Sequence, residues 1–199
     1  MLFRSEVRWG EVSIATDAEE RVRDARRHLG AVFQHPAASL DPRRTLLQSL
    51  SEPLQTHEPD TASGIAERVG QMLEQVGLPR HYASRRPAEL SGGEAQRAAI
   101  GRALILAPAL CVMDEPTSAL DPCTALSLLD KIRALNRELG TAFLLVSHDL
   151  AALASVSTSL VVLDDGRIVE TGPIARCYAA PQSVALRRLL AASGSALGE

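Results

Sequence analysis

The chain has 199 residues, of which 46% are hydrophobic and 3% aromatic, and a net charge of −3. This length predicts one domain with a sizeable core, built mainly from Leu, Ala and Val. No apolar run reaches the ~18–20 residues of a membrane span, no secretory signal is visible, and no basic stripe favours nucleic-acid binding. We therefore expect a soluble or peripheral protein that does not bind nucleic acid.

The first half of the chain alternates between short regular elements and turn-rich stretches. Hydrophobic periodicity and breaker residues predict the following elements: a strand at 6–14, a short helix at 17–28, a strand at 29–34, a loop with short helical pieces at 35–59, and a helix at 65–76 capped by Asp60 or Thr61 and ended by Gly77.

The second half alternates apolar strands with helices. The predicted elements are a buried strand at 110–114, a helix at 125–139, a buried strand at 142–147, a third at 160–163, a hairpin turn at Asp165-Gly166 and a helical tail from 181. This alternation predicts an α/β fold with a mainly parallel sheet covered on both faces. Ligands of such sheets bind at the carboxyl ends of the strands, where Gln34, Asp114, Glu115 and His148 all stand.

The run LSGGEAQR, residues 90–97, predicts the start of a helix whose N-terminus could receive an anion. Ser91 and Glu94 have the spacing of a capping box, and Gly92 and Gly93 allow close approach of another group. The helix should run to Ala107, before a proline, and its N-terminus suits an anion. A serine and a glutamate at this spacing most often form an ordinary cap, so the pattern has little weight alone.

The run CVMDEPTSALD, residues 111–121, takes an apolar strand into two adjacent carboxylates. Asp114 could hold Mg²⁺, and Glu115 could polarise an attacking water in phosphoryl transfer. His148 follows the next apolar strand and could contact a phosphoryl oxygen. Taken singly, the two carboxylates more often mark an ordinary turn, and the histidine is more often structural.

In chain order, Gln34, LSGGEAQR, the strand into DEP, SALD and His148 resemble the nucleotide-binding domain of ABC transporters. The resemblance extends from Glu6 to about Leu190, with Glu94 in place of the usual glutamine. It implies the following roles: Gln34 as the Q-loop glutamine near Mg²⁺ and the γ-phosphate, Ser91 to Glu94 as the signature motif, Asp114 as the Walker B aspartate for Mg²⁺, Glu115 as the catalytic base, Ser118 to Asp121 as the D-loop and His148 as the switch histidine.

The resemblance implies a P-loop NTPase-type fold with an inserted helical lobe near residues 60–105, and a flexible tail at 191–199. It implies ATP hydrolysis by two such domains that sandwich two ATP molecules with Mg²⁺. It also implies membrane permease subunits that dock around residues 34–59, on the cytoplasmic face of the membrane. The runs FQHPAASLDPRR and GRIVETGP resemble importers of oligopeptides, dipeptides and nickel.

The loop GxxxxGK[ST], which cradles ATP phosphates, does not occur in the sequence, and the single lysine is Lys131. We expect a chain that begins after its phosphate loop, with a foreign start at residues 1–5, an incomplete sheet and no ATPase activity of its own. One alternative is a non-catalytic half-site subunit that contributes only the signature motif. Another is a DNA-linked ATPase of related fold, although no heptad run of the kind those proteins carry is present.

Overall fold

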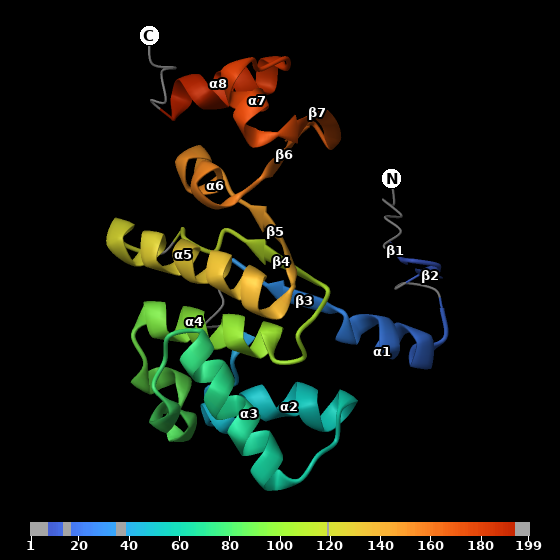
Figure 1. Ribbon diagram of the computed structural model, residues 1–199, viewed down its shortest axis with the longest axis vertical. Helices are drawn as coiled ribbons and strands as arrows, with labels where there is room; N and C mark the ends of the chain where they lie inside the picture. Colours follow the sequence, from blue (N-terminus) through green and yellow to red (C-terminus); the bar gives the residue numbers. More distant parts are fainter. Residues whose placement is uncertain (1–7, 14–16, 35–38, 119, 194–199) are drawn as a thin grey trace.

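A three-stranded parallel sheet organises the protein (Figure 1). The computed structural model describes residues 8–13, 17–34, 39–118 and 120–193. The sheet has the order β3-β4-β5, with β3 at Leu29–Val32, β4 at Leu110–Asp114 and β5 at Ala142–Val146. Since Val32 pairs with Met113, and Asp114 pairs with Val146, all three strands end at the same edge. The predicted parallel sheet is confirmed.

The N-terminal segment forms a short hairpin rather than the single strand predicted for residues 6–14. Within the described residues, β1 (Arg8–Trp9) pairs antiparallel with β2 (Val12–Ser13). Gly10 has a φ of 58°, a left-handed conformation that reverses the chain and that glycine adopts at little cost. The predicted helix that follows is confirmed as α1 (Glu19–Arg27).

Helix α2 (Leu46–His57) replaces the loop that the prolines predicted. Its start is fixed by a capping box between Thr45 and Gln48. Pro53 lies inside the helix and has no N–H for the carbonyl of Ser49. Arg102 Nε donates to that carbonyl at 3.2 Å instead. A contact from a distant helix therefore compensates for the proline, and no local pattern could have predicted it.

Helices α3 (Ala62–Gln75) and α5 (Pro122–Leu139) have the predicted ends. Thr61, rather than Asp60, caps α3 by accepting a hydrogen bond from Gly64 N at 3.2 Å. Gly140 ends α5 with a φ of 68°. Between these helices lie the short turns η2 (Arg80–Ser84) and η3 (Pro87–Glu89), then α4 (Gly92–Leu104), which ends slightly before the predicted Ala107.

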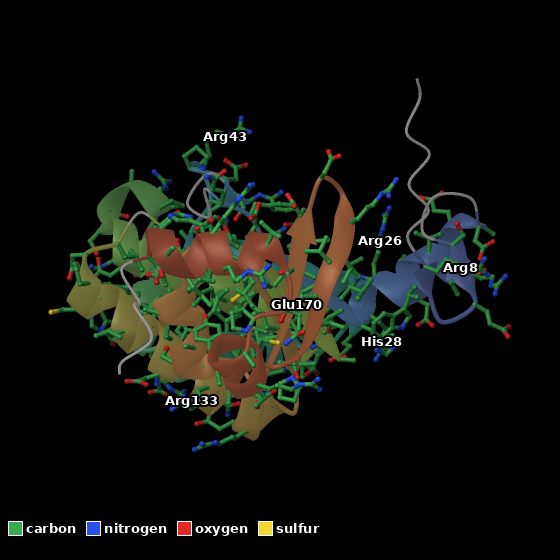
Figure 2. The ribbon with its side chains drawn as sticks, turned by 90° about the horizontal axis from the view of Figure 1, so that it is seen from above. Arg8, Arg26, His28, Arg43, Arg133 and Glu170 are labelled. Atoms are coloured by element: carbon green, nitrogen blue, oxygen red, sulfur yellow. The ribbon has the colours of Figure 1, made fainter. Side chains whose placement is uncertain are left out.

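The C-terminal elements form a second, smaller cluster. These are α6 (Leu150–Val156), the hairpin of β6 (Ser159–Asp164) and β7 (Arg167–Pro173), α7 (Ile174–Ala179) and α8 (Val184–Ala192). The predicted Asp165-Gly166 turn is confirmed, with φ of 47° and 72°. Figure 2 shows Glu170 on this hairpin, and its carboxylate accepts hydrogen bonds from Ser183 N at 2.8 Å and Ser183 Oγ at 2.7 Å. Glu170 thereby attaches the hairpin to the start of α8.

Helices cover one face of the sheet, and the other face is open. Cys111 and Met113 of β4 are fully buried against the main core, where burial raises the pKa of the Cys111 thiol to about 12. On β5, Leu144 and Val146 are each 48% exposed. The prediction of a sheet covered on both faces is therefore wrong for the described residues. No described strand pairs with the outer edge of β5, and β6 pairs only with β7.

Replacement of Leu73 should test the helical packing around α3. Leu73 is fully buried in the main core, so Leu73→Ala should lower the free energy of unfolding by about 2–5 kcal/mol. Leu126, which is 59% exposed on α5, provides the matched control, and Leu126→Ala should change stability by less than about 0.5 kcal/mol. Urea unfolding followed by circular dichroism measures both values. Equal effects of the two substitutions would contradict this packing.

Candidate functional site

Glu115 and His148 meet at the carboxyl edge of the sheet. His148 Nδ1 lies 2.7 Å from Glu115 Oε1, and the backbone N–H of His148 donates to the same oxygen at 3.2 Å. The Glu115 side chain is only 17% exposed, whereas the His148 side chain is 78% exposed. The hydrogen bond and the charge of Glu115 raise the pKa of His148 above its ordinary value of 6.5. Two residues that sequence reasoning selected separately therefore form one contact.

The backbone holds Glu115 in an unusual conformation. Its φ of 48° is left-handed, which is uncommon for a residue other than glycine and clusters at functional sites. The N–H of Glu115 donates to Val146 O at 2.8 Å, which extends the β4–β5 hydrogen-bonding by one residue. Ser118 Oγ donates to the carbonyl of Glu115 at 3.0 Å. These two hydrogen bonds, one to the N–H and one to the carbonyl of Glu115, therefore fix the backbone from which the carboxylate projects.

Asp114 and Gln34 lie at the same edge of the sheet. Asp114 is the last residue of β4 and is half-buried, and no hydrogen bond or ion pair engages its carboxylate within the described part of the chain. Gln34 is exposed and follows the end of β3, whose Val32 pairs with Met113. Because β3 and β4 are parallel, both side chains follow adjacent strand ends, as the sequence predicted. Residues 35–38 of the predicted docking segment are outside the described residues.

The start of α4 has the capping box that the sequence predicted. Glu94 N donates to Ser91 Oγ at 3.3 Å, and Ser91 N donates to Glu94 Oε2 at 2.8 Å. Ser91 and Gly92 are exposed, and a Cβ added to Gly92 would meet no atom within 4 Å. The first turn of α4 therefore presents backbone N–H groups at an open surface, which suits an anionic group.

The start of α5 lies against the start of α4. A Cβ on Gly93 would stand 3.2 Å from Thr124 Cγ2, so even an alanine there would require a small shift of the Thr124 side chain. Asp121 caps α5 by accepting hydrogen bonds from Thr124 N and Oγ1, which hold the pKa of the Asp121 carboxyl below its usual range. Ser118 and Asp121 thus lie between α4 and Glu115. Residue 119 of the predicted D-loop is outside the described residues.

Gln96 is a functional candidate that sequence reasoning missed. It is 5% exposed, and its Nε2 donates to Pro116 O at 2.7 Å, directly after Glu115. This hydrogen bond attaches α4 to the turn that holds the carboxylates. One signal could have found it, because a glutamine beside the alanines of α4 that face the core needs a buried hydrogen-bond partner.

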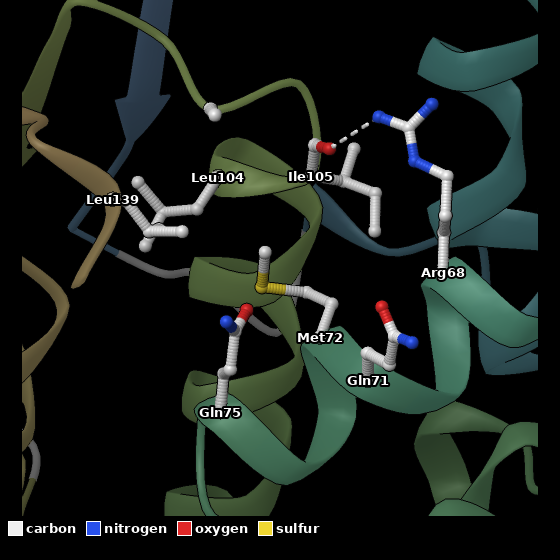
Figure 3. A pocket seen from close by; sticks show the side chains of 8 residues that line it. Arg68, Gln71, Met72, Gln75, Leu104, Ile105 and Leu139 are labelled. Atoms are coloured by element: carbon white, nitrogen blue, oxygen red, sulfur yellow. Dashed lines mark hydrogen bonds between the residues drawn. The ribbon is translucent and has the colours of Figure 1, made fainter.

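The described residues form two cavities away from these side chains. One, of about 130 Å³, lies between α3 and the ends of α4 and α5, and is lined by Met72, Leu104 and Leu139 among others (Figure 3). At its rim Arg68 donates to the carbonyl of Ile105 at 3.4 Å and to Glu58 at 2.8 Å. None of the predicted site residues lines this cavity. The candidate site is instead an open edge, which fits a ligand shared with another surface.

Comparison with known proteins identifies the family. The family model described as "ABC transporter" matches residues 3–118. The chain belongs to the ABC transporter family. The ABC transporter ATP-binding protein YejF of Escherichia coli is 41% identical over 169 residues, which are 84% of this chain and 32% of YejF. The glutathione import ATP-binding protein GsiA of Salmonella typhimurium is 40% identical over 192 residues, which are 94% of this chain and 31% of GsiA.

Solved structures of ABC proteins share the fold. The ATP-binding cassette MJ0796, a dimer in a post-hydrolysis state bound to ADP and Pi, superposes with a TM-score of 0.74 at 28% identity, over 86% of this chain and 74% of that one. The cbiO1 protein of Clostridium perfringens, part of the transporter complex cbiONQ, has a TM-score of 0.74 at 24% identity, over 82% of this chain and 64% of that one. The predicted P-loop NTPase-type fold is confirmed.

The ABC chain spans about a third of the length of the curated relatives it matches. Within the four described ranges, no helix combines the length and the apolar character needed to cross a bilayer.

The contact between Glu115 and His148 predicts a specific titration. His148 should titrate above 6.5 in the unmodified chain, and Glu115→Gln should lower its pKa towards that value, because the carboxylate charge is gone. Since the folded pKa is raised, the contact should stabilise the fold fully below about pH 6.5 and lose this effect as pH rises through the raised pKa. NMR of the imidazole protons measures the shift, with the other histidines as internal controls. An unchanged His148 titration would contradict the contact.

Proposed function

We propose that this chain contributes the catalytic carboxylate to one ATP site of an ABC importer and the signature motif to the ATP site of a partner domain. The observation that carries the proposal is the Glu115–His148 contact, at the edge where Asp114 and Gln34 also end. Family membership supports ATP as the ligand, and the ADP and Pi bound to MJ0796 agree with it. Carboxylates and an amide at one sheet edge, next to an open helix N-terminus, fit phosphoryl chemistry.

Glu115 is the proposed general base. His148 occupies its Oε1 with two hydrogen bonds, which leaves Oε2 for a water molecule that attacks the γ-phosphorus. His148 also orients the carboxylate and, with its raised pKa, can present a positive charge to a phosphoryl oxygen. The left-handed backbone at Glu115 fixes the direction of the base before ATP arrives.

Asp114 and Gln34 are the proposed protein ligands for Mg²⁺. The free Asp114 carboxylate and an adjacent amide oxygen are ligands that Mg²⁺ accepts, usually with water and phosphate oxygens completing its shell. The described residues contain no group of three or more His, Cys, Asp or Glu side chains suited to a metal, in keeping with an ion held largely by the nucleotide. Bound there, Mg²⁺ would neutralise charge on the phosphates.

The phosphate cradle is proposed to add to the outer edge of β5. That edge is unpaired within the described residues, and Leu144 and Val146 beside it are half exposed. Parallel strands are normally covered on both faces, so a further strand, loop and helix would bury this surface. A loop at the end of such a strand would lie beside the base, Glu115.

The proposed assembly is a dimer of nucleotide-binding domains attached to membrane permease subunits. In it, Ser91, Gly92, Gly93 and Glu94 of one domain face ATP held by the other, with Ser118 and Asp121 at the same junction. Residues 34–59 are the proposed permease contact, and residues 60–105 the helical lobe that positions it. This arrangement would put the protein at the cytoplasmic face of the membrane.

A peptide or a peptide-like molecule is the proposed solute. The run FQHPAASLDPRR supports this class by resemblance. The relatives agree with it, since GsiA is named for glutathione import and YejF of Agrobacterium fabrum for peptidoglycan transport. The latter is 38% identical over 182 residues, which are 91% of this chain and 33% of that protein. Uptake of labelled peptides by membranes that contain the assembled transporter would test the class.

The 199-residue chain alone should not hydrolyse ATP. Its single lysine, Lys131, lies within α5, so the chain has no lysine to contact the β- and γ-phosphates of ATP. Loss of that electrostatic stabilisation raises the free energy of the transition state by several kcal/mol. Phosphate release by the purified chain should equal that of its Glu115→Gln variant. Release above that control would contradict the proposal, whereas joining a phosphate-loop segment upstream should restore turnover.

Mixing two variants of the ATPase that includes a phosphate loop should reveal the geometry of the dimer. Glu115→Gln should bind ATP, lose turnover by at least about 100-fold and remain closed. Ser91→Arg should prevent closure by placing bulk and charge at the start of α4. In the mixed dimer one subunit carries Glu115→Gln and the other carries Ser91→Arg. Both substitutions then affect the same composite ATP site, because Ser91 faces the ATP held by the other subunit. The second ATP site keeps an unmodified Glu115 and an unmodified Ser91.

The mixture should therefore regain turnover that neither homodimer has, provided that the sites act independently. Phosphate release and crosslinking across the dimer measure activity and closure. If Ser91→Arg homodimers closed around ATP like the unmodified protein, the role proposed for α4 would be wrong.

A further inference from the structure

The Glu94 carboxylate is held on both of its oxygens. Its Oε2 accepts a hydrogen bond from Ser91 N at 2.8 Å, and its Oε1 accepts one from the hydroxyl of Tyr82 at 3.0 Å. The bonds with Ser91, followed by that with Tyr82 and the positive charge of Arg85, hold the pKa of Glu94 below its usual range. Glu94 therefore stands ionised in the first turn of α4.

Tyr82 reaches Glu94 from the short turn η2 rather than from α4 itself. It lies in η2, and its ring packs against the main core. The guanidinium carbon of Arg85 lies 3.7 Å from the centre of the Tyr82 ring, on its face, and His81 meets the ring edge at a centroid distance of 5.0 Å. The carbonyl of Arg85 accepts a hydrogen bond from Leu46 N at 2.8 Å, at the start of α2.

An ionised Glu94 creates a difficulty for the proposed site. The N-terminus of α4 attracts anions, and a carboxylate in its first turn is itself an anion that would repel an arriving phosphate. A glutamine would make the same cap without the charge. Arg85 brings a compensating positive charge, and the Tyr82 hydroxyl donates to the carboxylate oxygen that the cap leaves unused.

We propose that Tyr82 and Arg85 are positioning residues for the signature helix. They hold the Glu94 carboxylate against Ser91 and offset its charge, so that the N–H groups of Gly92 and Gly93 remain open to an ATP phosphate. This inference rests on the proposed function, because it assumes that ATP meets the start of α4. Tyr82 of η2 and Arg85, which follows η2, lie outside the sequence motifs that predicted the site.

A double-mutant cycle in the ATPase that includes a phosphate loop tests the pairing. Tyr82→Phe frees one carboxylate oxygen, so the ATP concentration for half-maximal rate should rise roughly three- to tenfold, with a smaller change in the maximal rate. In a Glu94→Gln background the same substitution should change this concentration less than about twofold, because a neutral amide does not repel phosphate. Arg85→Met should follow the same pattern.

Tyr178→Phe is the matched control. The Tyr178 hydroxyl donates to Leu150 O at 2.6 Å in the C-terminal cluster, so its removal should have the same effect in both backgrounds. If Tyr82→Phe also had equal effects in both backgrounds, its role would be structural and the inference would be overturned. If the unmodified ATPase hydrolysed ATP no faster than its Glu115→Gln variant, the proposed function would be wrong, and the inference would be wrong with it.

Discussion

The parallel register of β3, β4 and β5 is the constraint on which the candidate site depends. It brings the three strand ends to one edge, so that Gln34 and Asp114, which are far apart in the chain, follow adjacent strands. The hydrogen bond from Glu115 N to Val146 O continues this register past the end of β4. The Glu115–His148 contact follows, because each residue stands just beyond one of two paired strands.

Helix α4 connects this edge to the helical lobe. Gln96 bonds to Pro116 O in the carboxylate turn, Gly93 lies against Thr124 of α5, and Arg102 bonds to Ser49 O in α2. Contacts near the start, middle and end of the helix therefore attach it to three different elements. These contacts fix the position of α4 between α2 and the turn that holds Glu115.

The open face of the sheet and the unpaired edge of β5 belong to the same surface. Apolar side chains on β5 and on the β6–β7 hairpin, including Val161, Leu163 and Ile168, are about half exposed or more. Isolated exposed apolar residues are ordinary, but several on the same strands form a surface that suits contact with another segment. The proposed phosphate-loop segment would cover it and would complete the site at the same time.

The sequence by itself determined the strand at 110–114, the strand predicted at 142–147, the helix ends at Ser91 and Gly140, and the order of the site residues, because these features depend on local periodicity and local hydrogen bonds. It left Asp60 and Thr61 as alternative caps of α3, and the structure selects Thr61. Tertiary structure decided the rest. Helix α2 persists through Pro53 because Arg102 replaces the lost donor. Tyr82 reaches Glu94, and Gln96 reaches Pro116, only after the lobe has packed. The apolar sequence of β5 predicted a buried strand, but Leu144 and Val146 are half exposed. An apolar sequence shows that a strand suits burial, but it does not show which other segment buries it.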